Sequence, residues 1–136
     1  MNDPIETPRR PGFTGHIGMR RAGFAQDYAQ FELTLGPEHL NPLGIPHGGV
    51  YATILDTALG SSGSWMGDPD RFLPSITLNL NVSYLSQPKG GTRLTCEGRR
   101  VGGGRNIFFA EGEVRDETGQ ILASATGTFK LVKPRA

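Results

Sequence analysis

"NPLGIPHGGVYATILDTALG", residues 41–60, decides the fold, because it carries the one convincing helical pattern in the chain. Apolar residues occupy almost every side of the helix predicted for residues 47–61, which is typical of a buried helix. Two features do not serve stability. Gly48 and Gly49 each cost about 1 kcal/mol relative to alanine inside a helix. Asp56 lies among apolar residues and has no basic neighbour three or four positions away. Such departures from local rules are typical of functional sites.

Strand patterns surround this helix. Residues 76–85, "ITLNLNVSYL", alternate strictly between apolar and polar side chains, which predicts a half-buried antiparallel strand. Turn signals then separate three further predicted strands, near 92–101, 106–115 and 120–132. Before the helix, residues 18–35 read as one extended segment. One buried helix followed by an antiparallel meander predicts an α+β fold in which the sheet wraps around the helix.

Length and composition narrow the class of protein. The chain has 136 residues, and we expect a flexible, Pro-rich lead-in over residues 1–15 and a single domain over residues 16–136. The net charge of +1 does not indicate a nucleic-acid surface. No apolar stretch has the length of a signal peptide core or a membrane span, so a cytoplasmic location is the default expectation. The histidines and the single cysteine, Cys96, lack metal-ligand spacing, and we assign no metal and no cofactor.

Helix geometry separates the two unusual features of the helix. Asp56 follows His47 by nine residues, which places it about 13–14 Å further along the axis and roughly half a turn around it. The helix mouth and the carboxylate therefore cannot meet at one small reacting group within a single chain. Either they perform separate tasks, or a second copy of the chain brings its Asp56 to the helix mouth of the first. We prefer a two-fold dimer, because an isologous interface repeats each contact and the predicted strand 76–85 offers an edge for joining two sheets.

These residue types suit acyl chemistry. The N–H groups of Gly48 and Gly49 have no intrahelical acceptor and lie at the positive end of the helix dipole, where they can stabilise an oxyanion. Asp56 suits a general base toward water, or a nucleophile that forms an anhydride, and Asn41 could add a side-chain donor. The expected reaction is hydrolysis of an activated acyl group. Structural roles stay open: the glycines could serve a tight turn, and Asp56 could pair with a distant arginine. Similarly, His47 could serve solely as the residue that starts the helix, and Asn41 could serve solely as part of a turn.

Three segments together resemble the hotdog-fold acyl-CoA thioesterases of the phenylacetyl-CoA thioesterase-like group. They are residues 41–60, "LNVSYLSQP" and "GTRLTCEGRRVGGGRNIFFAEGEVRDETGQILASATGTFK". The most specific element is His-Gly-Gly with an aspartate nine residues after the histidine, matched here by His47, Gly48, Gly49 and Asp56. The resemblance implies an antiparallel sheet wrapped around one long central helix. It also implies homodimers, and commonly tetramers, with active sites at the subunit interface.

The resemblance implies roles for individual residues of the helix mouth. The family's asparagine six residues before the histidine falls on Asn41. In that family the glycine N–H, here that of Gly48, polarises the thioester carbonyl together with the asparagine, and His47 supports the arrangement. Gly49 is assigned to substrate binding. Asp56 of the partner chain would activate water or attack the carbonyl directly.

Further assignments depend on the same resemblance. Aligning "NVSY" with the family's N-[IV]-[ST]-Y places the hydroxyl residue that steadies the water on Thr77, with Ser75 close enough to compete. The family's substrates are coenzyme A thioesters. Their phosphates lie at the surface, so Arg99, Arg100 and Arg105 become the candidates to meet them.

Two other functions stay open at the level of sequence. A hotdog enoyl-CoA hydratase or dehydratase would need the histidine as acid/base partner of a carboxylate in one pocket, and this motif lacks that setting. A non-catalytic acyl-CoA-binding module would gain nothing from an unpaired buried charge near its ligand. The leading prediction is an acyl-CoA thioesterase that releases a free acid and CoA. Its acyl group is open to aromatic, short and medium-chain types, and the apolar loop 62–74, with Trp65, Met66 and Phe72, is a candidate to touch it.

Overall fold

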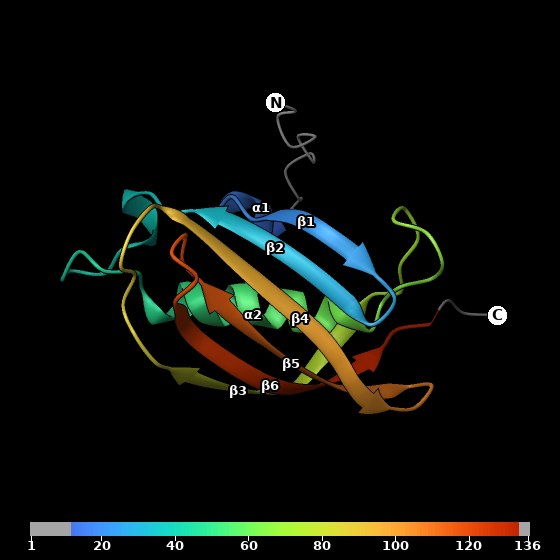
Figure 1. Ribbon diagram of the computed structural model, residues 1–136. Coiled ribbons are helices and arrows are strands. Elements are labelled where there is room, and N and C mark those ends of the chain that lie inside the picture. Colours follow the sequence, from blue (N-terminus) through green and yellow to red (C-terminus); the bar gives the residue numbers. More distant parts are fainter. Residues whose placement is uncertain (1–11, 134–136) are drawn as a thin grey trace.

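The computed structural model describes residues 12–133, which form one antiparallel sheet curved around a long helix (Figure 1). In chain order the elements are α1 (Gly12–His16), β1 (Arg20–Ala25), β2 (Tyr28–Thr34), the 3-10 helix η1 (Pro37–His39), α2 (Gly48–Ser62), β3 (Ser75–Tyr84), β4 (Arg93–Gly103), β5 (Ile107–Arg115) and β6 (Ile121–Leu131). The strand order in the sheet is β1-β2-β4-β5-β6-β3, and every neighbouring pair is antiparallel. The predicted α+β hotdog layout is confirmed.

Two glycines let α2 pack closely against the middle of the sheet. A Cβ atom added at Gly98 on β4 would lie 2.3 Å from the carbonyl oxygen of Ala58 on the helix. A Cβ atom added at Gly112 on β5 would lie 2.8 Å from Cδ1 of Leu59. Around this close contact the core is filled by large, fully buried side chains, chiefly Phe31, Phe108, Phe129, Ile54 and Leu55. Burying each side chain of this size stabilises the fold by roughly 1.5–3 kcal/mol.

The segment predicted as one extended stretch over residues 18–35 is a hairpin. β1 and β2 pair with each other and turn at Gln26 and Asp27, and Asp27 adopts a positive φ of 59°. Aspartate tolerates this left-handed conformation better than most residues. Because the turn contains no glycine or proline, it carries no strong turn signal in the sequence.

The N-terminal lead-in predicted over residues 1–15 overlaps a helix. α1 covers residues 12–16, so the last part of the predicted lead-in is helical, while residues 1–11 lie outside the described residues. Within residues 12–133, no helix is long and apolar enough to cross a membrane.

β3 is an edge strand with a bulge that breaks the strict alternation predicted for residues 76–85. The register with β6 shifts between Thr77 and Asn79, so Leu78 is the extra residue. Thr77 pairs with the fully buried Phe129 and therefore faces inward, toward α2. A strictly alternating strand would have turned this polar side chain outward. The bulge thus changes which side chains the strand presents to the helix.

Candidate active site

The mouth of α2 is shaped by its N-cap residue, His47. His47 has an extended backbone, and its Nδ1 accepts a hydrogen bond from the Gly49 N–H at 2.8 Å. This bond requires a neutral imidazole with its proton on Nε2. The Gly49 N–H is therefore occupied, although the sequence suggested it as a free donor. Among the described residues, the Gly48 N–H has no acceptor, and it lies at the positive end of the helix dipole.

Asn41 lies beside this free donor. Its Oδ1 accepts hydrogen bonds from the N–H groups of Leu43, at 2.9 Å, and Ile45, at 3.4 Å, which fixes the carboxamide in a turn. With the oxygen occupied, the Nδ2 amide is the group left to donate. Asn41, Gly48 and Tyr84 line one cavity of about 490 Å³, which we call the mouth cavity. The turn role and the donor role of Asn41 are thus compatible.

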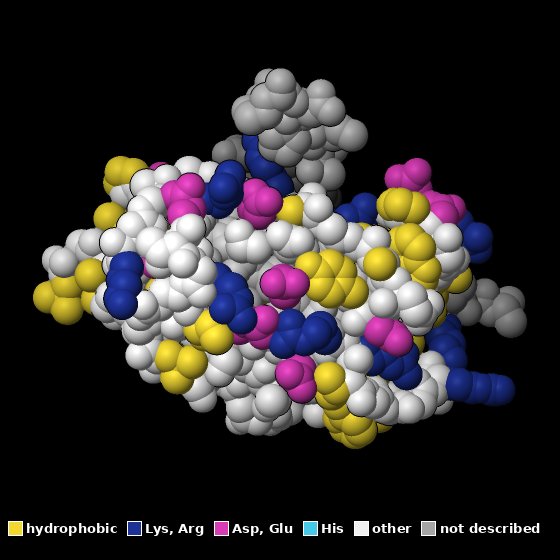
Figure 2. Space-filling model, in the orientation of Figure 1, with side chains coloured by type: hydrophobic (Ala, Val, Ile, Leu, Met, Phe, Trp, Pro, Cys, Tyr) yellow, Lys and Arg dark blue, Asp and Glu magenta, His cyan; other side chains and the backbone are white. Residues whose placement is uncertain are grey.

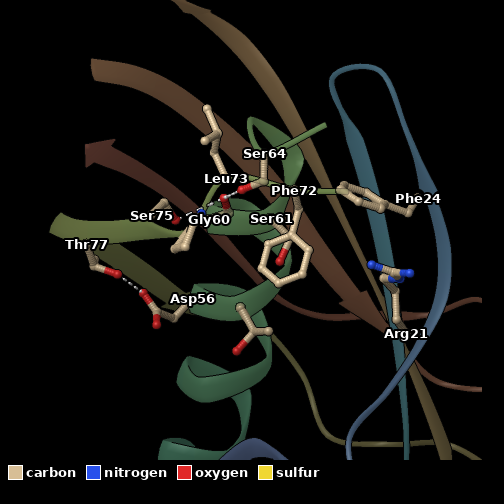
Figure 3. Close-up of a pocket in the computed structure, with 12 residues that line it drawn as sticks. Arg21, Phe24, Asp56, Gly60, Ser61, Ser64, Phe72, Leu73, Ser75 and Thr77 are labelled. Atoms are coloured by element: carbon tan, nitrogen blue, oxygen red, sulfur yellow. Dashed lines mark hydrogen bonds between the residues drawn. The ribbon is translucent and has the colours of Figure 1, made fainter. Parts of the chain in front are cut away.

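Asp56 and Thr77 form the second half of the predicted constellation, and Figure 3 shows them pointing toward one another from α2 and β3. Thr77 Oγ1 donates to Asp56 Oδ1 at 2.5 Å. The bulge at Leu78 makes this contact possible, because it turns Thr77 inward. Ser75, the competing hydroxyl, donates instead to the Gly60 carbonyl at 3.0 Å. Thr77 is therefore the hydroxyl that meets the carboxylate.

The cleft around this carboxylate, which we call the carboxylate cleft, has a volume of about 230 Å³. Its opposite wall comes from β1, where Arg21 and Phe24 lie across the cleft from Asp56 (Figure 3). Of the apolar loop residues, Phe72 lines the cleft, while Trp65 packs edge-on against Phe24 with 5.0 Å between ring centroids. Within residues 12–133, no cationic side chain forms an ion pair with Asp56. The distant arginine pair that would explain Asp56 structurally is not found there.

The mouth cavity and the carboxylate cleft are separate. They share no lining residue, although both draw on α2. Gly48 and Asn41 line the first, whereas Asp56 and Thr77 line the second. The structure therefore brings the four residues together as two pairs and does not join the pairs within one chain.

Arg99, the first of the three predicted phosphate contacts, is already engaged. Its guanidinium donates two hydrogen bonds to the Glu113 carboxylate, at 3.0 and 2.6 Å, on the face of the sheet that points away from α2. Hydrogen bonding to Glu113 raises the pKa of Arg99 above its ordinary value, and the same bond lowers the pKa of Glu113. Figure 2 shows charged side chains of both signs mixed over this face, so it offers no large patch of one sign.

Arg100 and Arg105 lie nearer the β4–β5 turn. The Arg100 guanidinium lies 5.4 Å from the centroid of the Phe108 ring and donates to the Gly104 carbonyl at 2.9 Å. Arg105 is exposed and has no carboxylate partner within residues 12–133. Arg99 and Arg100 thus bind to different parts of the chain.

Among residues 12–133, no group of three or more His, Cys, Asp or Glu side chains could hold a metal ion. Cys96 is buried beneath α2, and burial raises the pKa of its thiol well above the usual range. The thiol therefore stays protonated and unreactive at neutral pH.

Tyr84 is a residue of the mouth to which sequence reasoning assigned no role. Its Oη donates to the carbonyl oxygen of Gly48 at 2.9 Å. The signal was present, because Tyr84 ends the "NVSY" segment of the family pattern. What the sequence did not show is that the end of β3 reaches the start of α2.

Comparisons with known proteins agree with the fold described above. The family model of the thioesterase superfamily matches residues 43–123. Acyl-coenzyme A thioesterase 13 from Mus musculus is 27% identical over 101 residues, which are 74% of this chain and 70% of that protein. The structure of the conserved protein PA5202 from Pseudomonas aeruginosa has a TM-score of 0.81 at 22% identity, and the match covers 95% of this chain and all 100% of that one.

A further solved structure is the BH2602 protein from Bacillus halodurans with CoA. That protein is 32% identical to this chain and has a TM-score of 0.66, and the match covers 76% of this chain and 66% of that one. The family model spans more than half of the 136 residues and includes both Gly48 and Asp56. The fold and this match lead to one conclusion: the chain belongs to the thioesterase superfamily and is a hotdog-fold thioester hydrolase.

Proposed function

We propose that the protein hydrolyses acyl-CoA thioesters to a free acid and CoA, at a site composed of two copies of the chain. The observation that carries the proposal is the separation of the two half-sites. Gly48 and Asn41 present donors in the mouth cavity, and Asp56 with Thr77 presents a carboxylate in another cleft. Thioester hydrolysis needs donors on the carbonyl oxygen and a base or nucleophile at its carbon at the same time. A second copy supplies the half that each chain lacks.

The open edge of β3 is the surface where we place the contact between copies. Among the described strands, β3 ends the sheet and pairs only with β6, and Ile76 and Leu78 on it are 54% and 52% exposed. Two such edges that pair antiparallel about a two-fold axis set the end of one β3 beside the start of the other. Tyr84 at the end touches the helix mouth, and Thr77 near the start touches Asp56. Symmetric pairing therefore brings the half-sites together twice.

The proposed reaction follows from this arrangement. The thioester carbonyl oxygen accepts hydrogen bonds from the Gly48 N–H and from Asn41 Nδ2, and these donors stabilise the oxyanion. Thr77 occupies one oxygen of Asp56 and leaves the other to accept a proton from the attacking water. The tetrahedral intermediate then expels the thiolate of coenzyme A, which takes up the proton. Direct attack by Asp56, through an anhydride that water hydrolyses, fits the same positions.

The coenzyme A end of the substrate is assigned to the surface. Arg105 is exposed and Arg100 lies close to it in sequence, so these two remain the candidates for the phosphates. Arg99 is a weaker candidate, because Glu113 already holds its guanidinium. We also propose that the protein is located in the cytoplasm, as expected from its sequence.

The test is free-thiol release from a panel of acyl-CoAs. We expect steady release by the wild type and a fall in kcat of about 10²–10⁴ in the Asp56→Asn variant, because general-base catalysis contributes that much. KM should change little. Asp70→Asn is the matched control, because Asp70 is exposed and lines neither cavity. The protein's own Cys96 is buried and adds no thiol signal. An unchanged rate in Asp56→Asn would remove this residue from the mechanism.

The same panel of acyl-CoAs distinguishes the thioesterase from the hydratase alternative. That reaction needs a histidine as the acid/base partner of a carboxylate, but Nδ1 of His47 is already engaged by the Gly49 N–H as the N-cap of α2. Water addition to an enoyl-CoA without thiol release would favour the hydratase. Tight binding with neither reaction would favour a binding module.

A further inference from the structure

We propose that Tyr84 is a positioning residue that fixes the oxyanion donor at the helix mouth; this inference rests on the function proposed above. Tyr84 Oη donates to the Gly48 carbonyl oxygen at 2.9 Å. That carbonyl belongs to the peptide group that joins Gly48 and Gly49. The N–H of the same peptide group donates to His47 Nδ1 at 2.8 Å. One peptide group is therefore held at both ends, by the last residue of β3 and by the N-cap of α2.

The helix mouth needs such a restraint because of its glycines. Glycine has more backbone freedom than any other residue type, and both Gly48 and Gly49 lie in the first turn of the helix. The first N–H groups of a helix have no intrahelical acceptor. Rotation about the Cα of Gly48 changes the angle between the held peptide group and the free Gly48 N–H. A donor stabilises an oxyanion only within about 2.7–3.1 Å, and a misplacement of about 1 Å can lower the rate about 100-fold. Fixing the neighbouring peptide group therefore fixes the direction of the donor.

Close packing supports the same role. A Cβ atom added at position 48 would lie 3.3 Å from both Cε1 and Oη of Tyr84, so the ring lies directly against the Gly48 backbone. The ring also contacts Tyr51 on α2, with 6.2 Å between centroids and 53° between planes. Tyr84 thus joins the edge strand to the first turn of the helix. It lines the mouth cavity beside Asn41, the second predicted donor.

The test is the Tyr84→Phe variant, which removes only the hydroxyl and keeps the ring. We expect kcat to fall roughly tenfold while KM stays within about twofold, because the lost interaction acts in the transition state. Tyr28→Phe is the matched control. This change also removes a tyrosine hydroxyl, but one that donates to the Glu97 side chain at 2.8 Å, and Tyr28 lines neither cavity. This control should keep the wild-type kcat.

A double-mutant cycle gives a readout that a merely structural role would not move. His47→Ala and Tyr84→Phe release the same peptide group, so their combined loss of kcat should be clearly smaller than the product of the two single losses. Losses that multiply would overturn the proposal. So would a full kcat in Tyr84→Phe, or a rise in KM alone.

Hydrogen exchange at the Gly49 amide, measured by NMR on 15N-glycine protein, tests the inference without activity. We expect faster exchange in Tyr84→Phe and unchanged exchange in Tyr28→Phe, because only the first releases the peptide group. Unchanged exchange in Tyr84→Phe would overturn the proposal whatever the kinetics. If the wild type shows no Asp56-dependent thiol release, the proposed function fails, and the exchange measurement still decides whether Tyr84 holds the helix mouth.

Discussion

The Thr77 hydroxyl orients the carboxylate of Asp56, the predicted base or nucleophile. Its bond to Asp56 Oδ1, at 2.5 Å, fixes the side-chain rotamer and leaves Oδ2 for water. A hydrogen bond to a charged group is worth about 1.5–3 kcal/mol, so Thr77→Val should lower kcat by about 10–100-fold. Thr77→Ser keeps the donor and should keep most of the activity. Steady-state kinetics of the two variants measure this difference, and a loss in Thr77→Ser as large as that in Thr77→Val would show that the hydroxyl alone does not account for the role of Thr77.

The residues that break local rules were the ones that the sequence singled out. Gly48 and Asp56 were predicted because neither suits a buried helix, and the structure leaves the Gly48 N–H and the Asp56 carboxylate facing cavities. The Gly49 N–H was expected to be free as well, but His47 Nδ1 accepts it. Which of two adjacent amides is capped depends on one side-chain rotamer of the histidine, and the sequence does not contain that information.

How well the helices and strands could be predicted from the sequence depended on the turns between them. The glycine-marked turns after β4 and β5 were expected, and α2 begins and ends within one residue of the predicted span 47–61. The β1–β2 turn was missed, because Asp27 adopts its positive φ without a glycine. The bulge at Leu78 was missed for a related reason: an alternating pattern reports side-chain type, while the register shift depends on how β3 pairs with β6. That bulge is also what carries Thr77 to Asp56.

The β5–β6 connection depends on one buried carboxylate, Asp116. Its Oδ1 accepts from Thr118 Oγ1 at 2.6 Å and from the Gln120 N–H at 3.1 Å, while Oδ2 accepts from the Lys89 N–H at 2.7 Å. The bond from the Thr118 hydroxyl, followed by that from the Lys89 amide, lowers the pKa of Asp116 to about 2. The folded state therefore holds this proton more weakly than the unfolded state does. The stabilisation of the folded state by the ionised Asp116 carboxylate is complete above the unfolded pKa of about 3.9 and is lost as pH falls through about 2.

This linkage predicts a specific acid response. Asp116→Asn should lower the free energy of unfolding at pH 7, and its difference from the wild type should shrink as pH falls from about 4 to about 2. Denaturant titrations over a pH series measure that difference. The exposed Asp70→Asn variant is the control and should stay close to the wild type throughout. A gap for Asp116→Asn that is constant with pH would show that packing, and not the ionised carboxylate, holds the hairpin.

At the scale of the whole molecule, the inference that two copies share a site came from counting residues along a helix. Asp56 lies nine positions after His47, and the structure assigns Gly48 at the helix mouth and Asp56 to different cavities. The shape of each cavity was beyond reach of the sequence, because segments distant in the chain form its walls. Arg21 on β1 and Phe72 before β3, for example, meet only across the folded carboxylate cleft.

A mixing experiment decides whether the half-sites belong to one catalytic unit. Asp56→Ala removes the carboxylate half. Gly48→Pro removes the donor N–H while keeping the helix, because Gly48 follows the N-cap and proline is favoured at that first position. Each variant alone should be inactive. In a mixed dimer one of the two sites regains an intact Gly48 from one chain and an intact Asp56 from the other, so equal mixing with full exchange should restore about a quarter of the wild-type rate. Mass-tagged subunits establish the exchange. Proven exchange without recovered thiol release would place both halves in a single chain and refute the shared site.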